Sequence, residues 1–252
     1  MASPLEQFTI KPITPIEIGG VDLMFTNSSL MMVLGVLLSA GFLLLAGRKA
    51  ALVPGRLQGF AEVSYQFIAG MVKENAGPEG MKYFPLIFSI FTFVLMGNLL
   101  GMMPFSFTYT SHLIVTLALA LMVIITVIVV GLLRHGLHFF SLFFPSGVPW
   151  PIYFILTPVE IISFLARPFS LSMRLFLNMM AGHMVLKIFA GFCVMMVSLG
   201  GLMSLTSIVP FAVKFAVTGF EFGVAFLQAY IFTVFTCLYL RDAIYLHGHD
   251  DH

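Results

Sequence analysis

The sequence predicts an all-α integral membrane protein with about five to six membrane helices. Of its 252 residues, 60% are hydrophobic and only 9% are Asp, Glu, Lys or Arg, whereas an ordinary soluble protein carries about 25% charged residues. The apolar residues also gather in runs of about 20 or more, the length needed to cross some 30 Å of hydrocarbon. Such a chain could not cover a water-facing surface, so we expect the bilayer to be its solvent.

Three of the apolar runs are typical of ordinary transmembrane helices. The first two cover Ser29–Gly47 and Pro85–Met103. The third, Leu113–Leu133, is interrupted only by Thr116 and Thr126, whose hydroxyls can bond back to the helix backbone. These runs belong to a single membrane domain that we expect to cover residues 29–252.

Two further segments look too short or too charged to cross the bilayer. Gly55–Tyr83 interleaves charges with aromatic and aliphatic residues, a pattern that predicts a helix lying at the membrane interface. After Arg134, the segments Leu137–Phe144 and Tyr153–Leu156 flank a cluster of prolines. We expect them to form a short helical hairpin whose turn the prolines make.

The last two apolar runs cover about Thr157–Ala190 and Ser204–Leu240. At 1.5 Å per residue, each helix would be about 45 Å long or more, against some 30 Å of hydrocarbon. We therefore expect both helices to tilt strongly, to kink or to protrude. Pro168 and Pro210 are the expected points of bending.

The basic residues predict the orientation. With about five alternating spans, Lys11 is the only basic residue on one side, and the remaining loop cations fall on the other: Arg48, Lys49, Arg56, Lys73, Lys82, Arg134 and Arg241. Because basic loops stay on the cytoplasmic side, we expect residues 1–28 to face outward. The C-terminus then faces the cytoplasm or the mitochondrial matrix.

Charges inside the last two runs are the main candidates for function, because a charge near the centre of a span costs about 2.5–3.5 kcal/mol even on the lenient insertion scale. Six are present: Glu160, Arg167, Arg174, Lys187, Lys214 and Glu221. Those near helix ends could extend to the interface. Arg174 and Glu221 lie well inside their runs, so they form either a functional site or a structural ion pair.

Spacing assigns these residues to faces. Glu160, Arg167 and Arg174 are seven apart and share one helix face, which Asn178 continues one turn later. His183, nine residues after Arg174, falls on the opposite side of a straight helix. One helix thus carries a permanent cation on one side and a titratable imidazole on the other.

A polar stripe also follows the final helix. Lys214, Glu221, Gln228 and Tyr239 are separated by steps of seven, seven and eleven, which keep them on one narrow face. The stripe could line a path for water or protons. It could equally be a helix–helix interface held by side-chain hydrogen bonds.

Several function classes lack a sequence signal. The net charge of +1 and the absence of a Lys/Arg block argue against nucleic acid as a partner. We find no hydrolase, metalloprotease, P-loop or dinucleotide motif, and we expect no cofactor. The C-terminal segment HGHDDH is expected to be a solvated tail and not a metal site.

Three motifs resemble a known family. The segment SLSMRLFLNMMAGH, from Ser170 to His183, resembles the arginine motif of subunit a of the F-type ATP synthases. FEFGVAFLQAYIFTVFTCLYL, from Phe220 to Leu240, is similar to the final helix of that family, and GNLLGMMP, from Gly97 to Pro104, resembles a motif in its second span. The likeness is ordered along the whole chain.

The resemblance implies a non-catalytic stator subunit of the Fo sector that couples proton flow to ATP synthesis. Its partners would be the c-ring, b-type stalk subunits, lipid and protons, in a bacterial inner membrane or, as an alternative, the mitochondrial one. Arg174 would face the ring with Asn178 and Gln228 as polar neighbours. Glu160 would lie toward the cytoplasmic half-channel, and His183 with Glu221 would line the outer one.

The chain departs from several bacterial members in one respect. Those relatives carry Glu after the Ala-Gly pair and His on the last helix, whereas this chain has His183 and Glu221, the arrangement of mitochondrial-type members. The pair keeps one acid and one imidazole, so the same role is expected, and the order of their proton transfers stays open. The choice between proton and sodium, and the ring stoichiometry, depend on the partner ring.

Two other classes compete with this interpretation. A secondary transporter could use an intramembrane ion pair, but such proteins usually contain two related halves, and no repeat is evident. An intramembrane enzyme would need a nucleophile with a base or a metal cluster, and the sequence shows neither.

Overall fold

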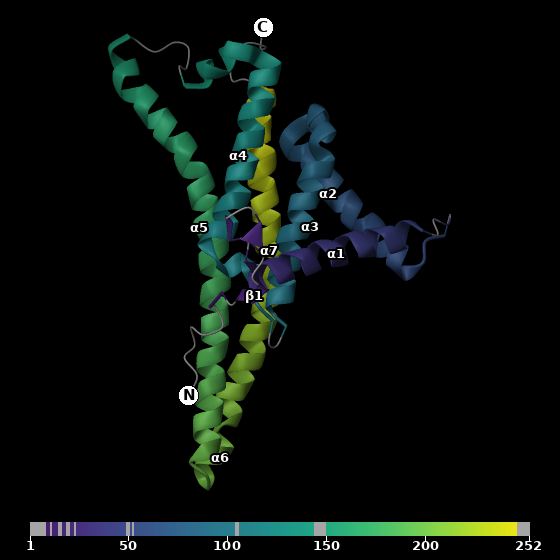
Figure 1. Ribbon diagram of the computed structural model, residues 1–252, viewed down its shortest axis with the longest axis vertical. Coiled ribbons are helices and arrows are strands. Elements are labelled where there is room, and N and C mark those ends of the chain that lie inside the picture. Colours follow the sequence, from purple (N-terminus) through teal and green to yellow (C-terminus); the bar gives the residue numbers. More distant parts are fainter. Residues whose placement is uncertain are drawn as a thin grey trace. The chain divides into compact units, whose positions relative to one another are not determined.

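The computed structural model describes residues 9–10, 12–14, 17–18, 21–22, 24–48, 51, 53–103, 106–143 and 150–245. The described chain is almost entirely helical (Figure 1). Its α-helices are α1 (Asn27–Gly47), α2 (Arg56–Gly80), α3 (Phe84–Gly101), α4 (Leu113–His135), α5 (Trp150–Ser198), α6 (Leu202–Thr206) and α7 (Ile208–Ile244). Three 3-10 helices join them: η2 (Met81–Tyr83), η3 (Tyr109–Ser111) and η4 (Gly136–Phe143).

The predicted all-α membrane fold is confirmed. Among the described residues, five helical segments are long and apolar enough to cross a membrane: Asn27–Gly47, Arg56–Gly101, Leu113–His135, Phe154–Ser198 and Ser204–Ile244. The three ordinary spans appear as α1, α3 and α4, each within a few residues of its predicted bounds. The chain is therefore a multi-pass membrane protein.

The N-terminal segment contains short strands that the sequence analysis missed. β1 (Pro12–Thr14) pairs antiparallel with β4 (Phe25–Thr26), and β2 (Glu17–Ile18) pairs antiparallel with β3 (Val21–Asp22). Pairs this short give little alternation from which to predict a strand. The outward location of residues 1–28 stays a prediction.

The segment predicted to lie at the interface is helical, as α2 and η2. The helix is interrupted at Gly77, whose φ is 74°, immediately before Pro78. Its position at the membrane surface, and the limits of a single membrane domain over 29–252, stay predictions.

The predicted short hairpin before the long helices is only partly correct. Gly136–Phe143 forms η4, but Tyr153–Leu156 belongs to the first turns of α5 and is not a separate arm. Pro151 can occupy the first turn because no intrahelical N–H bond is required there. The predicted turn, residues 144–149, lies outside the described residues, as does the C-terminal tail from residue 246.

Both long helices extend beyond their predicted bounds. The 49 residues of α5 would span about 74 Å at 1.5 Å per residue, and the 37 residues of α7 about 56 Å. α5 continues through Pro158 and Pro168. Pro210 instead lies in the first turn of α7, after a break at Ser207, because a proline at 210 cannot donate to the carbonyl four residues earlier.

The described chain divides into two compact units, each of which holds parts of α5 and α7. The first comprises Met1–Phe42, Thr92–Leu113 and Leu175–Ala229. The second comprises Leu43–Phe91, Ile114–Arg174 and Tyr230–His252. Fully buried residues mark the core of the first unit (Val94, Asn98, Tyr109, Leu175 and Met179) and of the second (Ile68, Val72, Ile87, Val123 and Phe232).

In the first unit, α5 reverses direction into α6 and α7. Gly200 and Gly201 make the turn with φ of 69° and 59°, left-handed values that glycine adopts without a steric cost. Contacts then run back along the two helices, from Cys193 near Ser207 to Asn178 near Gln228. In Figure 1 the two segments lie side by side above α6. This antiparallel register decides which polar residues meet.

Candidate functional site

His183 and Glu221 form a buried pair between α5 and α7 in the first unit. The Nδ1 of His183 lies 3.7 Å from Oε1 of Glu221, and the two residues are only 5% and 3% exposed. Gly182 permits the approach, since a Cβ there would meet the Glu221 carboxylate, with its Cδ 2.9 Å away. One imidazole and one carboxylate, the two groups that can exchange protons, are thus adjacent.

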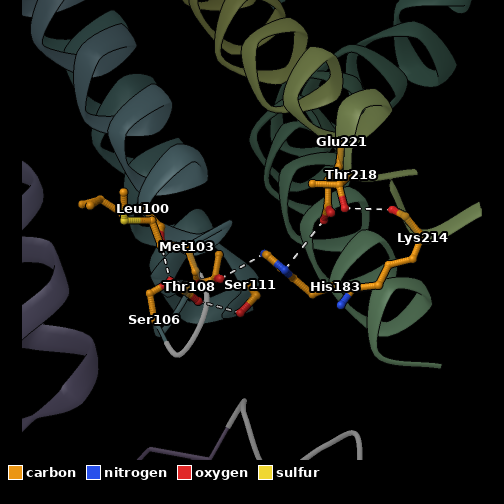
Figure 2. A network of polar contacts seen from close by, with 9 residues as sticks. All are labelled: Leu100, Met103, Ser106, Thr108, Ser111, His183, Lys214, Thr218 and Glu221. Atoms are coloured by element: carbon orange, nitrogen blue, oxygen red, sulfur yellow. Dashed lines mark hydrogen bonds and ion pairs between the residues drawn. The ribbon is translucent and has the colours of Figure 1, made fainter. Parts of the chain in front are cut away.

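The other ring nitrogen of His183 contacts the loop after α3. Figure 2 shows Nε2 of His183 against the hydroxyl of Thr108, at 3.0 Å. His112 is the last residue of this loop and stacks on Phe107, with ring centroids 4.9 Å apart. Burial lowers the pKa of its imidazole. His112 therefore tends to stay neutral, because burial disfavours the charged ring.

A second polar contact joins the same helices in this unit. Nδ2 of Asn178 donates to Oε1 of Gln228 over 2.8 Å; Asn178 is exposed and Gln228 is buried. Nearby on α7, the carbonyl of Ala225 accepts a hydrogen bond from the buried Asn98 side chain at 3.1 Å. Several buried polar atoms in this unit have no hydrogen-bond partner among the described residues, including both carboxylate oxygens of Glu221 and Nε2 of Gln228. Such atoms are ordinarily satisfied by water.

Arg174 opens onto a pocket in the second unit. The pocket has a volume of about 290 Å³ and is lined by Ser163, Ala166, Arg167, Ser170, Leu171, Arg174, Phe235 and Tyr239. The guanidinium carbon of Arg174 lies 5.1 Å from the centre of the Phe235 ring, a cation–π contact. Arg174 is exposed, and no acidic group within the described part of the chain pairs with it.

Arg167, seven residues earlier, has a different environment. Its Nη1 lies 2.9 Å from Oδ2 of Asp242, and its guanidinium carbon lies 5.5 Å from the centre of the Tyr239 ring. The pocket therefore contains two arginines, of which one is neutralised by an acid of the same chain. Arg174 keeps a net charge that a carboxylate from another molecule could meet.

The structure groups most of the residues selected from the sequence. It pairs His183 with Glu221 and Asn178 with Gln228, and it lines one pocket with Arg167, Arg174 and Tyr239. Glu160 is half-buried on α5 and does not line that pocket. The opposite placement of Arg174 and His183 on α5 stays a prediction, since the two residues belong to different units.

Three residues of these clusters were not selected from the sequence as site residues. Asp242 continues the seven-residue series Lys214, Glu221, Gln228 by two further steps, so extending that series would have found it. Asn98 lies within the GNLLGMMP motif. No sequence signal marks Thr108, because nothing local relates a loop hydroxyl to a histidine 75 residues later.

Comparison with known proteins identifies the family. The model of the ATP synthase A chain family matches residues 29–241. ATP synthase subunit a of Paramagnetospirillum magneticum is 56% identical over 98% of this chain and 100% of its own length. The subunit a proteins of Allorhizobium ampelinum and Rhodospirillum rubrum are 56% and 53% identical, each over 98% of this chain, covering 98% and 100% of their own lengths. The chain therefore belongs to the family of ATP synthase subunit a, the proton-channel subunit of the membrane Fo sector.

Proposed function

We propose that this chain is the stationary partner of a rotating ring of c subunits and forms two proton half-channels against that ring. Proton flow through them would drive rotation and so ATP synthesis by other subunits, while the chain itself would not act on ATP. Family membership supports this function over the transporter and enzyme hypotheses. The structural observation that carries the proposal is the exposed charge of Arg174, which has no acidic partner among the described residues.

Arg174 would act as a fixed cation between the half-channels. A carboxylate of a c subunit can cross lipid only in its neutral form, because a bare charge in hydrocarbon is costly. Opposite Arg174 the carboxylate would be held ionised. Since a guanidinium does not release its own proton, Arg174 would also prevent protons from passing directly between the two half-channels.

The His183–Glu221 pair would line the outer half-channel. A proton arriving there would neutralise the ring carboxylate and free it to rotate into lipid. After nearly a full turn the carboxylate would lose the proton into the inner half-channel, toward Glu160. Asn178, Gln228 and Tyr239 would be the polar neighbours of this path. The transmembrane potential supplies about 2.3 kcal/mol per charge per 100 mV.

The proposal includes an assembly and an orientation. The chain would contact b-type stalk subunits in addition to the ring, and it would lie in a bacterial inner membrane, with the mitochondrial inner membrane as the alternative. The C-terminus would face the cytoplasm or matrix. Basic residues near the expected inner ends of helices, such as Arg134 and Arg241 in the last turns of α4 and α7, support this orientation.

Replacement of Arg174 tests the function. In the assembled complex reconstituted into vesicles, Arg174→Ala is expected to reduce ATP-driven proton pumping to background, because the ring carboxylate loses the charge that keeps it ionised. Arg241→Gln is the matched control, since it removes an exposed cation from the end of α7. Assembly of each variant is verified by subunit composition.

Pumping at the wild-type rate by assembled Arg174→Ala would refute the fixed-cation mechanism. Equal losses in Arg174→Ala and Arg241→Gln would also contradict it, because the effect would then follow net charge and not the position of Arg174. A selective loss in Arg174→Ala supports the proposal.

A further inference from the structure

The imidazole of His183 is held at both of its nitrogens. Nδ1 faces Oε1 of Glu221 at 3.7 Å, and Nε2 is within 3.0 Å of the Thr108 hydroxyl. Both partners are buried, at 3% and 2% exposure. Within the described residues, the hydrogen bond to His183 is the one that the Thr108 side chain makes. Figure 2 shows His183 between Thr108 on one side and Glu221 on the other.

The backbone of the α3–α4 loop fixes the position of Thr108. Thr108 has an extended conformation and precedes η3, and its carbonyl accepts hydrogen bonds from the hydroxyl of Ser111 at 2.6 Å and from the Ser111 amide at 3.2 Å. The side chain packs against Gly101, where an added Cβ would meet the Thr108 Cβ at 2.8 Å. Ser106 ties the same loop to the end of α3 through the carbonyls of Leu100 and Met103.

We propose that Thr108 is a positioning residue for proton transfer, which holds the His183 ring with Nδ1 toward Glu221 and keeps Nε2 hydrogen-bonded whether the ring is neutral or protonated. This inference rests on the proposed role of the His183–Glu221 pair in the outer half-channel.

A hydroxyl suits this position because it can reverse its role. With the neutral ring protonated at Nδ1, Nε2 is an acceptor and Thr108 donates to it. When the ring takes up a proton, Nε2–H becomes a donor and the hydroxyl accepts through a lone pair. Transfer of the Nδ1 proton to the Glu221 carboxylate then yields neutral imidazole and carboxylic acid. A buried ring nitrogen left without a partner in either state would be costly.

Other charged and titratable groups lie on the elements packed around His183. Lys187 lies four residues, about one turn, farther along α5. Glu221 lies on α7, and Lys214 of the same helix extends toward this cluster in Figure 2. The α3–α4 loop contains two titratable side chains among its described residues: Tyr109, whose hydroxyl donates to the carbonyl of Phe93, and His112, which stacks on Phe107. Thr108 is the partner that the structure gives Nε2.

Removal of the hydroxyl tests the proposal. Thr108→Val keeps the shape of the side chain and loses the hydrogen bond, whereas Thr108→Ser keeps the hydroxyl. We expect Thr108→Val to lower the rate of ATP-driven pumping by about tenfold or more, the ratio that corresponds to losing a hydrogen bond to a charged group. The protonated His183 ring makes the stronger hydrogen bond to the hydroxyl, so loss of the hydroxyl disfavours the protonated ring. The pH of half-maximal pumping is therefore also expected to fall. Thr108→Ser should stay close to wild type in both measurements.

Thr110 supplies a matched control in the same loop. It is fully buried, and its hydroxyl has no hydrogen-bond partner within the described residues. Thr110→Val therefore makes the same chemical change two residues away without touching His183. Its pH profile is expected to coincide with that of the wild type.

The outcomes separate this inference from the proposed function. If His183→Gln loses pumping while Thr108→Val matches wild type in rate and pH profile, the role of Thr108 is wrong and the half-channel stands. If His183→Gln itself pumps normally, the proposed outer half-channel is wrong. Thr108→Ala, which adds no volume, replaces the valine variant if that complex does not assemble. Thr108→Val and Thr108→Ala could both fail to assemble while Thr108→Ser and Thr110→Val assemble. That result would overturn the inference, because the hydroxyl would then be required for folding.

Discussion

Gly182, whose side chain is a single hydrogen atom, allows Glu221 to lie close to His183. A Cβ added at Gly182 would lie 2.9 Å from Cδ and 3.3 Å from Cγ of Glu221. These distances are shorter than ordinary van der Waals contacts. Because Glu221 is buried on α7, it has little room to retreat while keeping its contact with His183.

Replacing Gly182 should therefore disturb function more than folding. Gly182→Ala is expected to displace Glu221 and to lower coupled pumping by about tenfold or more, since overpacking of this kind costs about 1–3 kcal/mol. The measurement is ATP-driven acidification of vesicles that contain the assembled complex. Gly191→Ala is the control on the same helix, because a Cβ at Gly191 meets nothing within 4 Å. Equal rates in the two variants would show that Glu221 is not held against residue 182.

At the scale of elements, α5 and α7 contact each other through charged, polar and aromatic side chains within each unit. In the first unit Asn178 meets Gln228 and His183 meets Glu221. In the second unit Arg167 meets Asp242 and Arg174 lies over Phe235. Within each unit, the later residue of α5 contacts the earlier residue of α7, which is the pattern of antiparallel helices. In the second unit the contacting residues are seven apart on both helices, whereas in the first unit Asn178 and His183 are five apart and Gln228 and Glu221 are seven apart.

The Arg167–Asp242 pair gives an element-scale prediction. Asp242→Asn leaves the Arg167 cation without its acid and is expected to lower the thermal stability of the complex, whereas adding Arg167→Gln should restore part of the loss. The coupling is expected to be about 0.2–1 kcal/mol, since both side chains are partly exposed. A double-mutant cycle on melting of the purified complex measures it. Strictly additive losses would mean that the two residues do not interact.

At the scale of the whole molecule, the charge distribution predicts the orientation. Five segments of the described chain can cross a membrane, and an odd number places the two ends of the chain on opposite sides. The basic residues of the loops select the side that faces the cytoplasm. The predicted orientation depends on the order of the spans along the chain and not on their packing.

Cysteine labelling checks the orientation. In a chain whose native Cys193 and Cys237, both free thiols, have been replaced by serine, Ile10→Cys is expected to react with an impermeant maleimide added outside intact cells. Tyr245→Cys is expected to react only after the membrane is opened. Both positions are exposed, so the difference reports the side of the membrane. The reverse pattern would contradict the proposed orientation.

The sequence by itself determined the class of fold and the family. Run length and scarcity of charge identified the spans, because the bilayer accepts only long apolar helices with satisfied backbones. The same scarcity of charge brought Arg174, Glu221 and His183 forward as candidates, and the arginine motif identified the family. The sequence predicted helix ends less closely: α5 begins seven residues before the predicted run Thr157–Ala190 and ends eight residues after it.

Only the tertiary structure decided which side chains meet. Periodicity assigns a residue to a face of its own helix, but the register between helices depends on the turn at Gly200 and Gly201 and on packing along the whole contact. That register brings His183 to Glu221. In the second unit, packing gives Arg167 an acid partner in Asp242 and leaves Arg174 without one among the described residues. The contact of Thr108 with His183 joins a loop to a helix 75 residues away, a relation that local sequence does not encode because it arises only when the chain is packed.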